Sequence, residues 1–201
     1  MKKSFILMFF ALIATVSYAQ QQIPSELIWS VKGGMNISNW SQGGDTKAKI
    51  GYKIGGGAEW VFTNLWSVQS GLYLSSKGTK VDSDLLEVKV NEVYLEMPMM
   101  GAARFYLSDN TNLVLSAGPY IAYGIAGKTE ATVRGASTDK VNTFGDYGVK
   151  RFDLGIGVGV TAEINRLLVG LEGQYGFIKR LNFEGDSPKN MNLSITVGYK
   201  F

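Results

Sequence analysis

Apolar and polar residues alternate strictly over the last eleven positions of the chain, 191–201. The apolar set is Met191, Leu193, Ile195, Val197, Tyr199 and Phe201, with Asn, Ser, Thr, Gly and Lys in between. Period-two alternation predicts a β-strand with one apolar and one polar face. The segment matches the ~9–11 residues that a tilted barrel strand needs to cross a bilayer. An aromatic end of this kind is typical of the closing strand of outer-membrane barrels, which the barrel-assembly machinery recognises.

Seven earlier segments show the same alternation, so the sequence predicts eight strands in total. These segments are 27–38, 49–62, 66–75, 92–104, 113–125, 151–163 and 167–177. Short connections follow the second, fourth and sixth strands. Longer connections, 39–48, 77–89, 127–150 and 179–190, follow the others. This asymmetry indicates an all-β, antiparallel up-and-down transmembrane barrel with periplasmic turns and extracellular loops. An even, closed set of strands leaves no unpaired edge in the bilayer.

A soluble lipocalin-like barrel also has eight strands, but it turns its apolar face inward, and alternation alone does not separate the two. Two features favour an outward apolar face. The polar face is crowded with glycine, which suits a narrow interior. Aromatic residues also gather near the predicted periplasmic rim, as an interfacial girdle does. They are Trp29, Trp60, Phe62, Trp66, Phe105, Tyr199 and Phe201.

The N-terminus, residues 1–19, has the features of a secretory signal peptide. Lys2 and Lys3 form a charged start, residues 5–16 are apolar, and Ser17-Tyr18-Ala19 is a small-x-small cleavage site. The apolar run is shorter than the ~20 residues that a membrane-spanning helix needs. No cysteine follows it, which excludes lipoprotein anchoring. The mature barrel domain is therefore expected at 20–201.

The amino-acid composition limits the kinds of catalytic and binding site that the chain can form. The chain has no cysteine and no histidine, so Ser-His-Asp and Cys-His sites are impossible. Outer-membrane barrel enzymes use histidine, so we expect no enzyme, no catalytic residue and no cofactor. The net charge is +3, two units of which come from Lys2 and Lys3, and this gives no basis for nucleic-acid binding. Asp82, Asp84 and Glu87 could hold a cation, but a solvated charged loop explains them better, so no metal site is predicted.

Charges of both signs fall on the face that is predicted to point inward. They are Lys32, Lys53, Glu59, Glu92, Glu96, Arg104, Arg151, Asp153, Glu163, Glu172 and Lys200. They could form a proton or ion path, or a structural network of salt bridges that fills the lumen. The second interpretation is preferred, because an eight-stranded interior is only wide enough for side chains. Glu96 with Arg104 or Arg151 is one expected pair, and the barrel is expected not to conduct ions.

Three motifs resemble the PorT-like outer-membrane β-barrel family. The segment 94–100, Tyr-Leu-Glu-Met-Pro-Met-Met, is similar to that family's Tyr-Leu-Glu-Ile-Pro-Leu-Leu signature. The segment 117–120 looks like its Gly-Pro-Tyr strand, and 153–163 looks like its Asp-x-Gly strand. The resemblance implies an eight-stranded outer-membrane barrel. The name-giving member serves protein secretion, a role that does not transfer with the barrel motif.

The function expected first is a small non-porin outer-membrane barrel that displays surface loops, chiefly 127–150, in an envelope or interaction role. An accessory role in protein secretion is the second expectation, and a soluble lipocalin-like carrier is the third. The expected partners are outer-membrane lipid, the barrel-assembly machinery during biogenesis, and a protein at the loops or the periplasmic rim.

Overall fold

A computed structural model of the chain describes residues 26–41, 46–82, 86–133, 138–144, 149–179 and 188–201. These residues form ten β-strands. The strands are β1 (Glu26–Ser41), β2 (Thr46–Val61), β3 (Trp66–Asp82), β4 (Leu86–Ser108), β5 (Thr111–Ala126), β6 (Lys128–Val133), β7 (Thr138–Asn142), β8 (Phe152–Ile164), β9 (Leu167–Gly176) and β10 (Lys189–Lys200). No described segment is a helix long and apolar enough to cross a membrane. The expected signal peptide and residue Asp84 lie outside the described residues.

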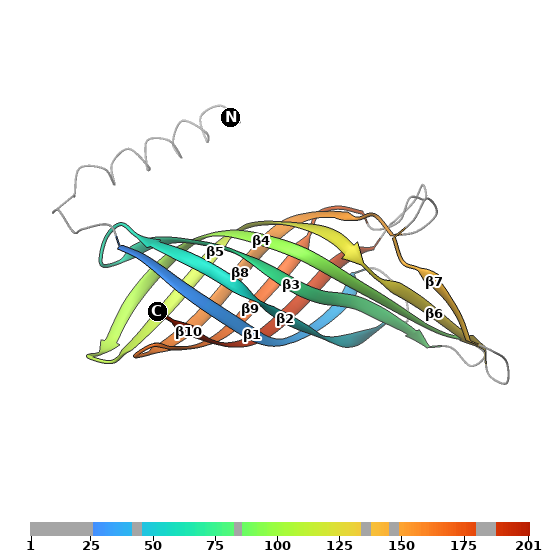
Figure 1. The fold of residues 1–201 in the computed structure, drawn as a ribbon, viewed down its shortest axis with the longest axis horizontal. Coiled ribbons are helices and arrows are strands. Elements are labelled where there is room, and N and C mark those ends of the chain that lie inside the picture. Colours follow the sequence, from blue (N-terminus) through green and yellow to red (C-terminus); the bar gives the residue numbers. More distant parts are fainter. Residues whose placement is uncertain (1–25, 42–45, 83–85, 134–137, 145–148, 180–187) are drawn as a thin grey trace, which may run out of the picture.

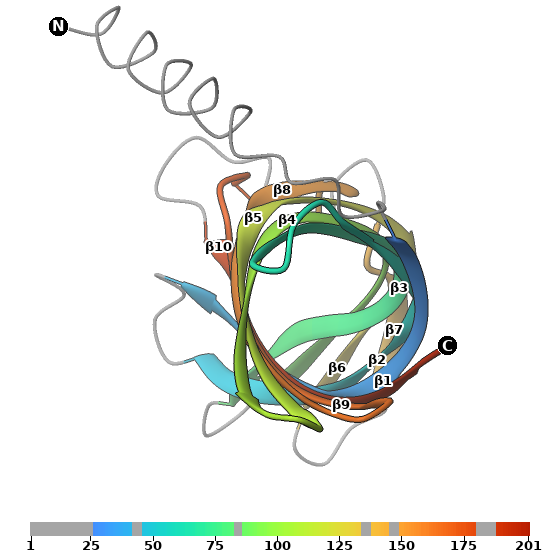
Figure 2. The same cartoon turned by 90° about the vertical axis from the view of Figure 1, so that its left-hand side faces the viewer.

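Eight of the strands close into an antiparallel barrel in the order β3-β2-β1-β10-β9-β8-β5-β4, and β3 pairs with β4 to complete the ring. Figure 2 shows this ring end-on. The short connections β2–β3, β4–β5 and β8–β9 lie at one end, together with the C-terminus (Figure 1). We call this the short-turn end and the opposite one the loop end. The predicted eight-stranded up-and-down barrel is therefore confirmed.

The strands continue further toward the loop end than the sequence predicts. The expected loop 39–48 is mostly the ends of β1 and β2, and the expected loop 77–89 is mostly the paired ends of β3 and β4. In addition, β6 pairs with β4, and β7 pairs with β6, as a hairpin outside the ring (Figure 1). Outside the bilayer no lipid imposes a continuous apolar outer face, so strand pairing continues there without the regular alternation by which a strand is recognised in the sequence.

The apolar face points outward, as predicted. Along β10, Met191, Ile195 and Val197 are about half exposed, whereas Ser194 between them is fully buried. The ten residue steps from Met191 to Phe201 rise about 25 Å at ~3.3 Å per residue and a tilt of ~40°, which is the height of the apolar band of a membrane barrel. An outward apolar band of this kind excludes the soluble lipocalin-like carrier, whose apolar face would line a cavity.

Aromatic side chains form belts at both limits of the apolar band. The seven girdle residues predicted from the sequence are all exposed, and pairing brings them to the short-turn end: Phe201 N–H donates to the Trp29 carbonyl at 2.9 Å. A second belt, which the sequence analysis did not identify, lies toward the loop end. Its members are Tyr52, Tyr123, Phe152, Tyr175 and Phe177. Two aromatic belts at the two limits of an apolar band about 25 Å high are the signature of a membrane-spanning barrel.

Phe201 fixes the end of the closing strand, and this generates a first prediction. Its backbone bonds to β1, its ring meets Tyr199 edge-on at 5.5 Å, and its side chain is 69% exposed at the rim. We expect Phe201→Ala to lower the amount of assembled barrel in the membrane fraction, measured by heat-modifiable gel mobility. Phe177→Ala, an exposed aromatic at the other end, is the matched control and should assemble normally. Equal assembly of both variants would contradict the prediction.

Candidate functional site

The polar face of the strands lines a lumen that is filled with charged side chains. Lys53, Glu92, Glu96, Asp153 and Glu163 are buried, as the sequence predicts, and Glu172 and Lys200 are partly buried. Lys77, which the sequence analysis placed at the start of a loop, is also buried here. Buried charges are tolerated when they are paired and hydrogen-bonded, so the pairing pattern decides what the lumen can do.

One network of ion pairs lies toward the short-turn end, around Arg104. One guanidinium nitrogen (Nη2) of Arg104 lies 2.9 Å from both carboxylate oxygens of Glu59 and 3.2 Å from Glu163. Lys200 Nζ reaches Glu163 at 2.8 Å. The Ser67 hydroxyl donates to Glu59, and the Asn112 amide donates to Glu163. This short-turn network joins β2, β4, β8 and β10 through the middle of the barrel.

A second network lies toward the loop end, around Glu96. Its two carboxylate oxygens lie 2.9 Å from Lys53 and 2.7 Å from Lys77. Lys53 also pairs with Glu172 at 3.0 Å. Gln174 completes this loop-end network by donating its amide to both Glu96 and Glu172 and accepting from Lys77. The Lys77 ammonium lies 4.8 Å from the centre of the Tyr120 ring, a cation–π distance.

The expected ion-pair partners were wrong in detail. Glu96 pairs with Lys53 and Lys77, not with Arg104 or Arg151. Arg151 is not in the lumen at all: it is exposed at the loop end, where it donates to the Gly124 carbonyl at 3.0 Å. Most of the ion pairs join strands that are not neighbours in the sheet, because the side chains reach across a narrow interior.

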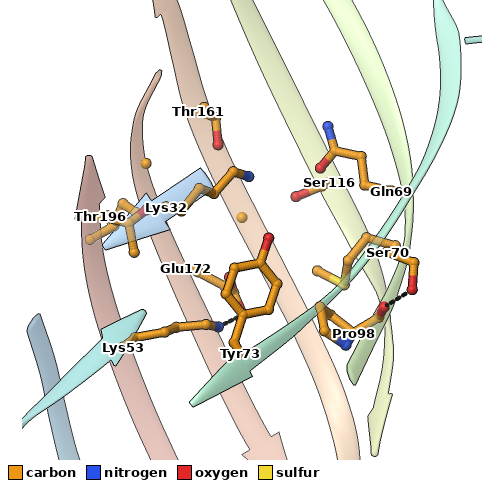
Figure 3. Close-up of a pocket in the computed structure, with 14 residues that line it drawn as sticks. Lys32, Lys53, Gln69, Ser70, Tyr73, Pro98, Ser116, Thr161, Glu172 and Thr196 are labelled. Carbon is orange, nitrogen blue, oxygen red and sulfur yellow. Dashed lines mark hydrogen bonds and ion pairs between the residues drawn. The ribbon is translucent and has the colours of Figure 1, made fainter. Parts of the chain in front are cut away.

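A small polar space separates the two networks (Figure 3). It consists of two adjoining cavities of about 40 and 30 Å³, which share Lys32, Gln69, Ser70, Tyr73 and Thr161 in their walls. Lys32 points into this space beside Thr161 and Ser116. A water needs about 10–15 Å³ on this measure, so the cavities have room for a few waters but for no larger solute.

Glycines on the inner face make room for the large rings that fill the lumen. A Cβ atom at Gly57 would lie 2.7 Å from the Tyr73 hydroxyl, and one at Gly155 would lie 2.6 Å from the Tyr120 ring. The Tyr120 hydroxyl in turn donates to Asp153 at 3.2 Å, and the Asn190 amide donates to the same carboxylate at 2.7 Å. The glycine-rich inner face predicted from the sequence thus accommodates aromatic side chains rather than an open channel.

An apolar cluster that the sequence analysis missed lies in the mouth at the loop end. Phe144 folds back into the mouth and meets Tyr94 edge-on at 5.7 Å. Val90, Tyr120, Ala122 and Val149 complete this mouth cluster. A side chain at Gly124 would collide with the Phe144 ring. The aromatic residues of the segment 127–150 are Phe144 and Tyr147, and two such residues in a mostly polar segment show no periodicity that indicates where Phe144 packs.

The candidate cation ligands do not gain support. No group of three or more acidic residues in the described part of the chain is arranged to hold a metal ion. The structure describes no side chain for Asp82 or Glu87, and Asp84 lies outside the described residues.

A comparison with protein families gives the decisive match. The model described as an outer membrane protein β-barrel domain matches residues 18–182, more than half of the chain. The chain belongs to this outer-membrane β-barrel family. It is thus a small barrel protein of the Gram-negative outer membrane, as the sequence predicts, and its short-turn end and loop end correspond to the periplasmic and outer sides of such barrels.

Solved barrels with related folds are distant in sequence. The attachment invasion locus protein Ail of Yersinia pestis is 16% identical, with a TM-score of 0.47 over 88% of this chain and 99% of Ail. Neisserial surface protein A is 14% identical, with a TM-score of 0.44 over 89% of this chain and 100% of that protein. OprG from Pseudomonas aeruginosa is 14% identical, with a TM-score of 0.44 over 88% and 97%. The comparison with curated proteins finds no match.

The Arg104 pairs generate a second prediction for this outer-membrane barrel. Arg104→Met leaves Glu59 and Glu163 buried without their central cation. We expect a loss of about 3–5 kcal/mol in the free energy of unfolding, measured by urea titration in lipid vesicles. Adding Glu59→Gln should restore part of the loss, because fewer buried charges then lack a partner. Lys200→Met, which removes a partly exposed partner of Glu163, is the control and should cost less. A stability unchanged by Arg104→Met would refute this role.

A third prediction concerns conduction. Two ion-pair networks and the mouth cluster lie in series along the lumen, so we expect folded wild-type protein to show no steady ion conductance in planar bilayers. The control is heat-modifiable mobility of the same sample, which shows that the barrel is folded and inserted. Reproducible, large single-channel steps from folded protein would overturn the sealed-lumen interpretation.

Proposed function

We propose that this barrel is a non-porin membrane anchor that presents an extracellular β-sheet to a protein partner. The observation that carries the proposal is the continuation of the barrel wall beyond its apolar band. Beyond the apolar band, β2 pairs with β3, β3 with β4, β4 with β6, and β6 with β7. The residues of this outer sheet are 46–48, 79–82, 86–90, 128–133 and 138–142. Building such a sheet outside the membrane contributes nothing to spanning it, so the sheet supports a role at the surface.

The edge of this sheet suits a partner that binds through its backbone. β7 is the last strand in the sheet order of the described residues. A strand edge offers main-chain N–H and C=O groups on which an extended partner segment can pair. The ion pairs that fill the lumen support the same conclusion, because a barrel that does not conduct acts through its rims and its outer surface.

An accessory role in secretion is not favoured by any contact in the structure. The motif that carries the PorT-like resemblance, 94–100, is explained by barrel construction: Tyr94 and Glu96 are buried in the lumen, and Leu95 and Met99 face the lipid. An enzymatic role also lacks support, since the chain has no histidine or cysteine and the lumen carboxylate Glu96 is held by two cations. Outer-membrane lipid, and the barrel-assembly machinery acting on β10 after removal of residues 1–19, complete the proposed partners.

Replacing residues 128–142 with a short Gly-Ser turn tests the proposed function, because this removes the hairpin and leaves the eight-stranded ring. Surface cross-linking on intact cells, followed by mass spectrometry, should capture a defined protein with the wild type and lose it with the variant. The matched control is a Gly-Ser replacement of Asp109-Asn110 in a turn at the opposite end. An identical set of cross-linked proteins from both variants would argue against display by the hairpin.

A further inference from the structure

A groove of about 600 Å³ lies where β5 ends and the hairpin begins. Val93, Ile125, Ala126, Lys128, Glu130 and Arg151 contribute to its walls. Part of its lining is the outer face of the barrel wall, and Phe144 of the mouth cluster also lines it. Val90 is buried inside, so the alternating positions Asn91 and Val93 of β4 point outward. Lys128 and Glu130 flank Thr129, which pairs with Val90, and they therefore point outward as well.

The height of the groove places it at the boundary between acyl chains and headgroups. Tyr123 and Phe152 of the outer aromatic belt pair with each other, and Tyr123 also pairs with Leu95. Val93, two residues further along β4, lies about 5 Å above Leu95 at ~3.3 Å per residue and a tilt of ~40°, and so close to the belt. Ile125 is 47% exposed at the same level. The lower wall is therefore apolar and continuous with the lipid-facing band, and the upper wall projects among the headgroups.

The upper wall carries more positive than negative charge. Arg151 is held in place, with its guanidinium carbon 5.4 Å from the centre of the Phe144 ring and one N–H on the Gly124 carbonyl. A guanidinium has five N–H groups, so Arg151 can still contact an anion. Lys128 is exposed. Glu130 is the carboxylate in this wall, and it sits opposite Lys89 in the register of β6 and β4.

We propose that this groove binds a phosphorylated glycolipid of the outer leaflet. Lys128 and Arg151 contact a headgroup phosphate, and Val93 and Ile125 pack against the first carbons of an acyl chain. Charge complementarity argues for the phosphate, because Arg and Lys bind phosphate oxygens through charge-assisted hydrogen bonds. The apolar lower wall argues for a lipid-linked phosphate rather than a free one. The inference depends on the outer-membrane location and is independent of the proposed display function.

Native mass spectrometry of the detergent-folded barrel, titrated with bisphosphorylated lipid A, tests the proposal. We expect one lipid A per barrel, with an apparent Kd raised at least about tenfold by Lys128→Ser through loss of a charge-assisted contact. Lys189→Ser is the matched control: it removes a cation at the same end of the barrel, on β10, and should leave the Kd unchanged. Arg151→Lys, which keeps the charge but loses the planar fork, should weaken binding by less than Lys128→Ser combined with Arg151→Ser.

Competition identifies the source of the phosphate. Millimolar inorganic phosphate and phosphatidylglycerol should not displace lipid A from the groove. Displacement by inorganic phosphate would make the groove a site for free anions, and equal binding of phosphatidylglycerol would make it a general anionic surface; either result overturns the proposal. As a second readout in the same detergent samples, a photo-crosslinking residue in place of Ile125 should capture lipid A, whereas one in place of Ile195, in the middle of the apolar band and away from the groove, should capture less. Equal capture of lipid A at both positions would also overturn it.

Discussion

A bilayer offers no water to the backbone, so every N–H and C=O group that crosses it must be bonded within the protein. This chain meets that demand by closing eight strands into a ring. The pairing of β3 with β4 completes the ring, and the pairing of β10 with β1 joins the last strand of the chain to the first. Closure with so few strands fixes a narrow interior. The outward apolar band, the two aromatic belts and the filled lumen all follow from that choice, because each is what a narrow, closed ring in lipid requires.

The narrow interior also explains the character of the lumen. Polar residues on the inner face cannot reach bulk water in the middle of the barrel, so they must satisfy one another. Arg104 between Glu59 and Glu163, and Glu96 between Lys53 and Lys77, do this by reaching across the barrel. Except for Lys77 with Glu96, whose strands β3 and β4 pair directly, these contacts join strands that share no backbone pairing. The inward charges therefore form the network of salt bridges that the sequence analysis preferred over an ion path, and a few water-sized spaces remain between them.

How far the sequence predicts this structure depends on whether a residue's environment is periodic. Alternation in segments such as 191–201 reveals the eight strands and their outward face, because lipid on one side and lumen on the other impose a period of two. Ion-pair partners such as Lys53 with Glu96 depend on register and on distances across the lumen, which no local pattern encodes. The hairpin of β6 and β7 is missed because residues 128–142 show no regular alternation of apolar and polar residues. The position of Phe144 could not be predicted either, because a single residue has no pattern and its pocket is made by strands that are distant in the sequence.

The features of this barrel that are not needed to span the membrane lie mostly in the segment between β5 and β8. This segment supplies the hairpin that extends the outer sheet and the Phe144 ring of the mouth cluster. It also supplies Lys128, which lines the groove between the end of β5 and the hairpin. Arg151 links two of these parts, since its guanidinium stacks on Phe144 and also lines the groove. A ligand held by Arg151 therefore sits directly against the seal of the lumen. Phe144 lies close to the wall because residue 124 is glycine, and Phe144 also lines the groove, so the mouth cluster and the groove share one packed side chain.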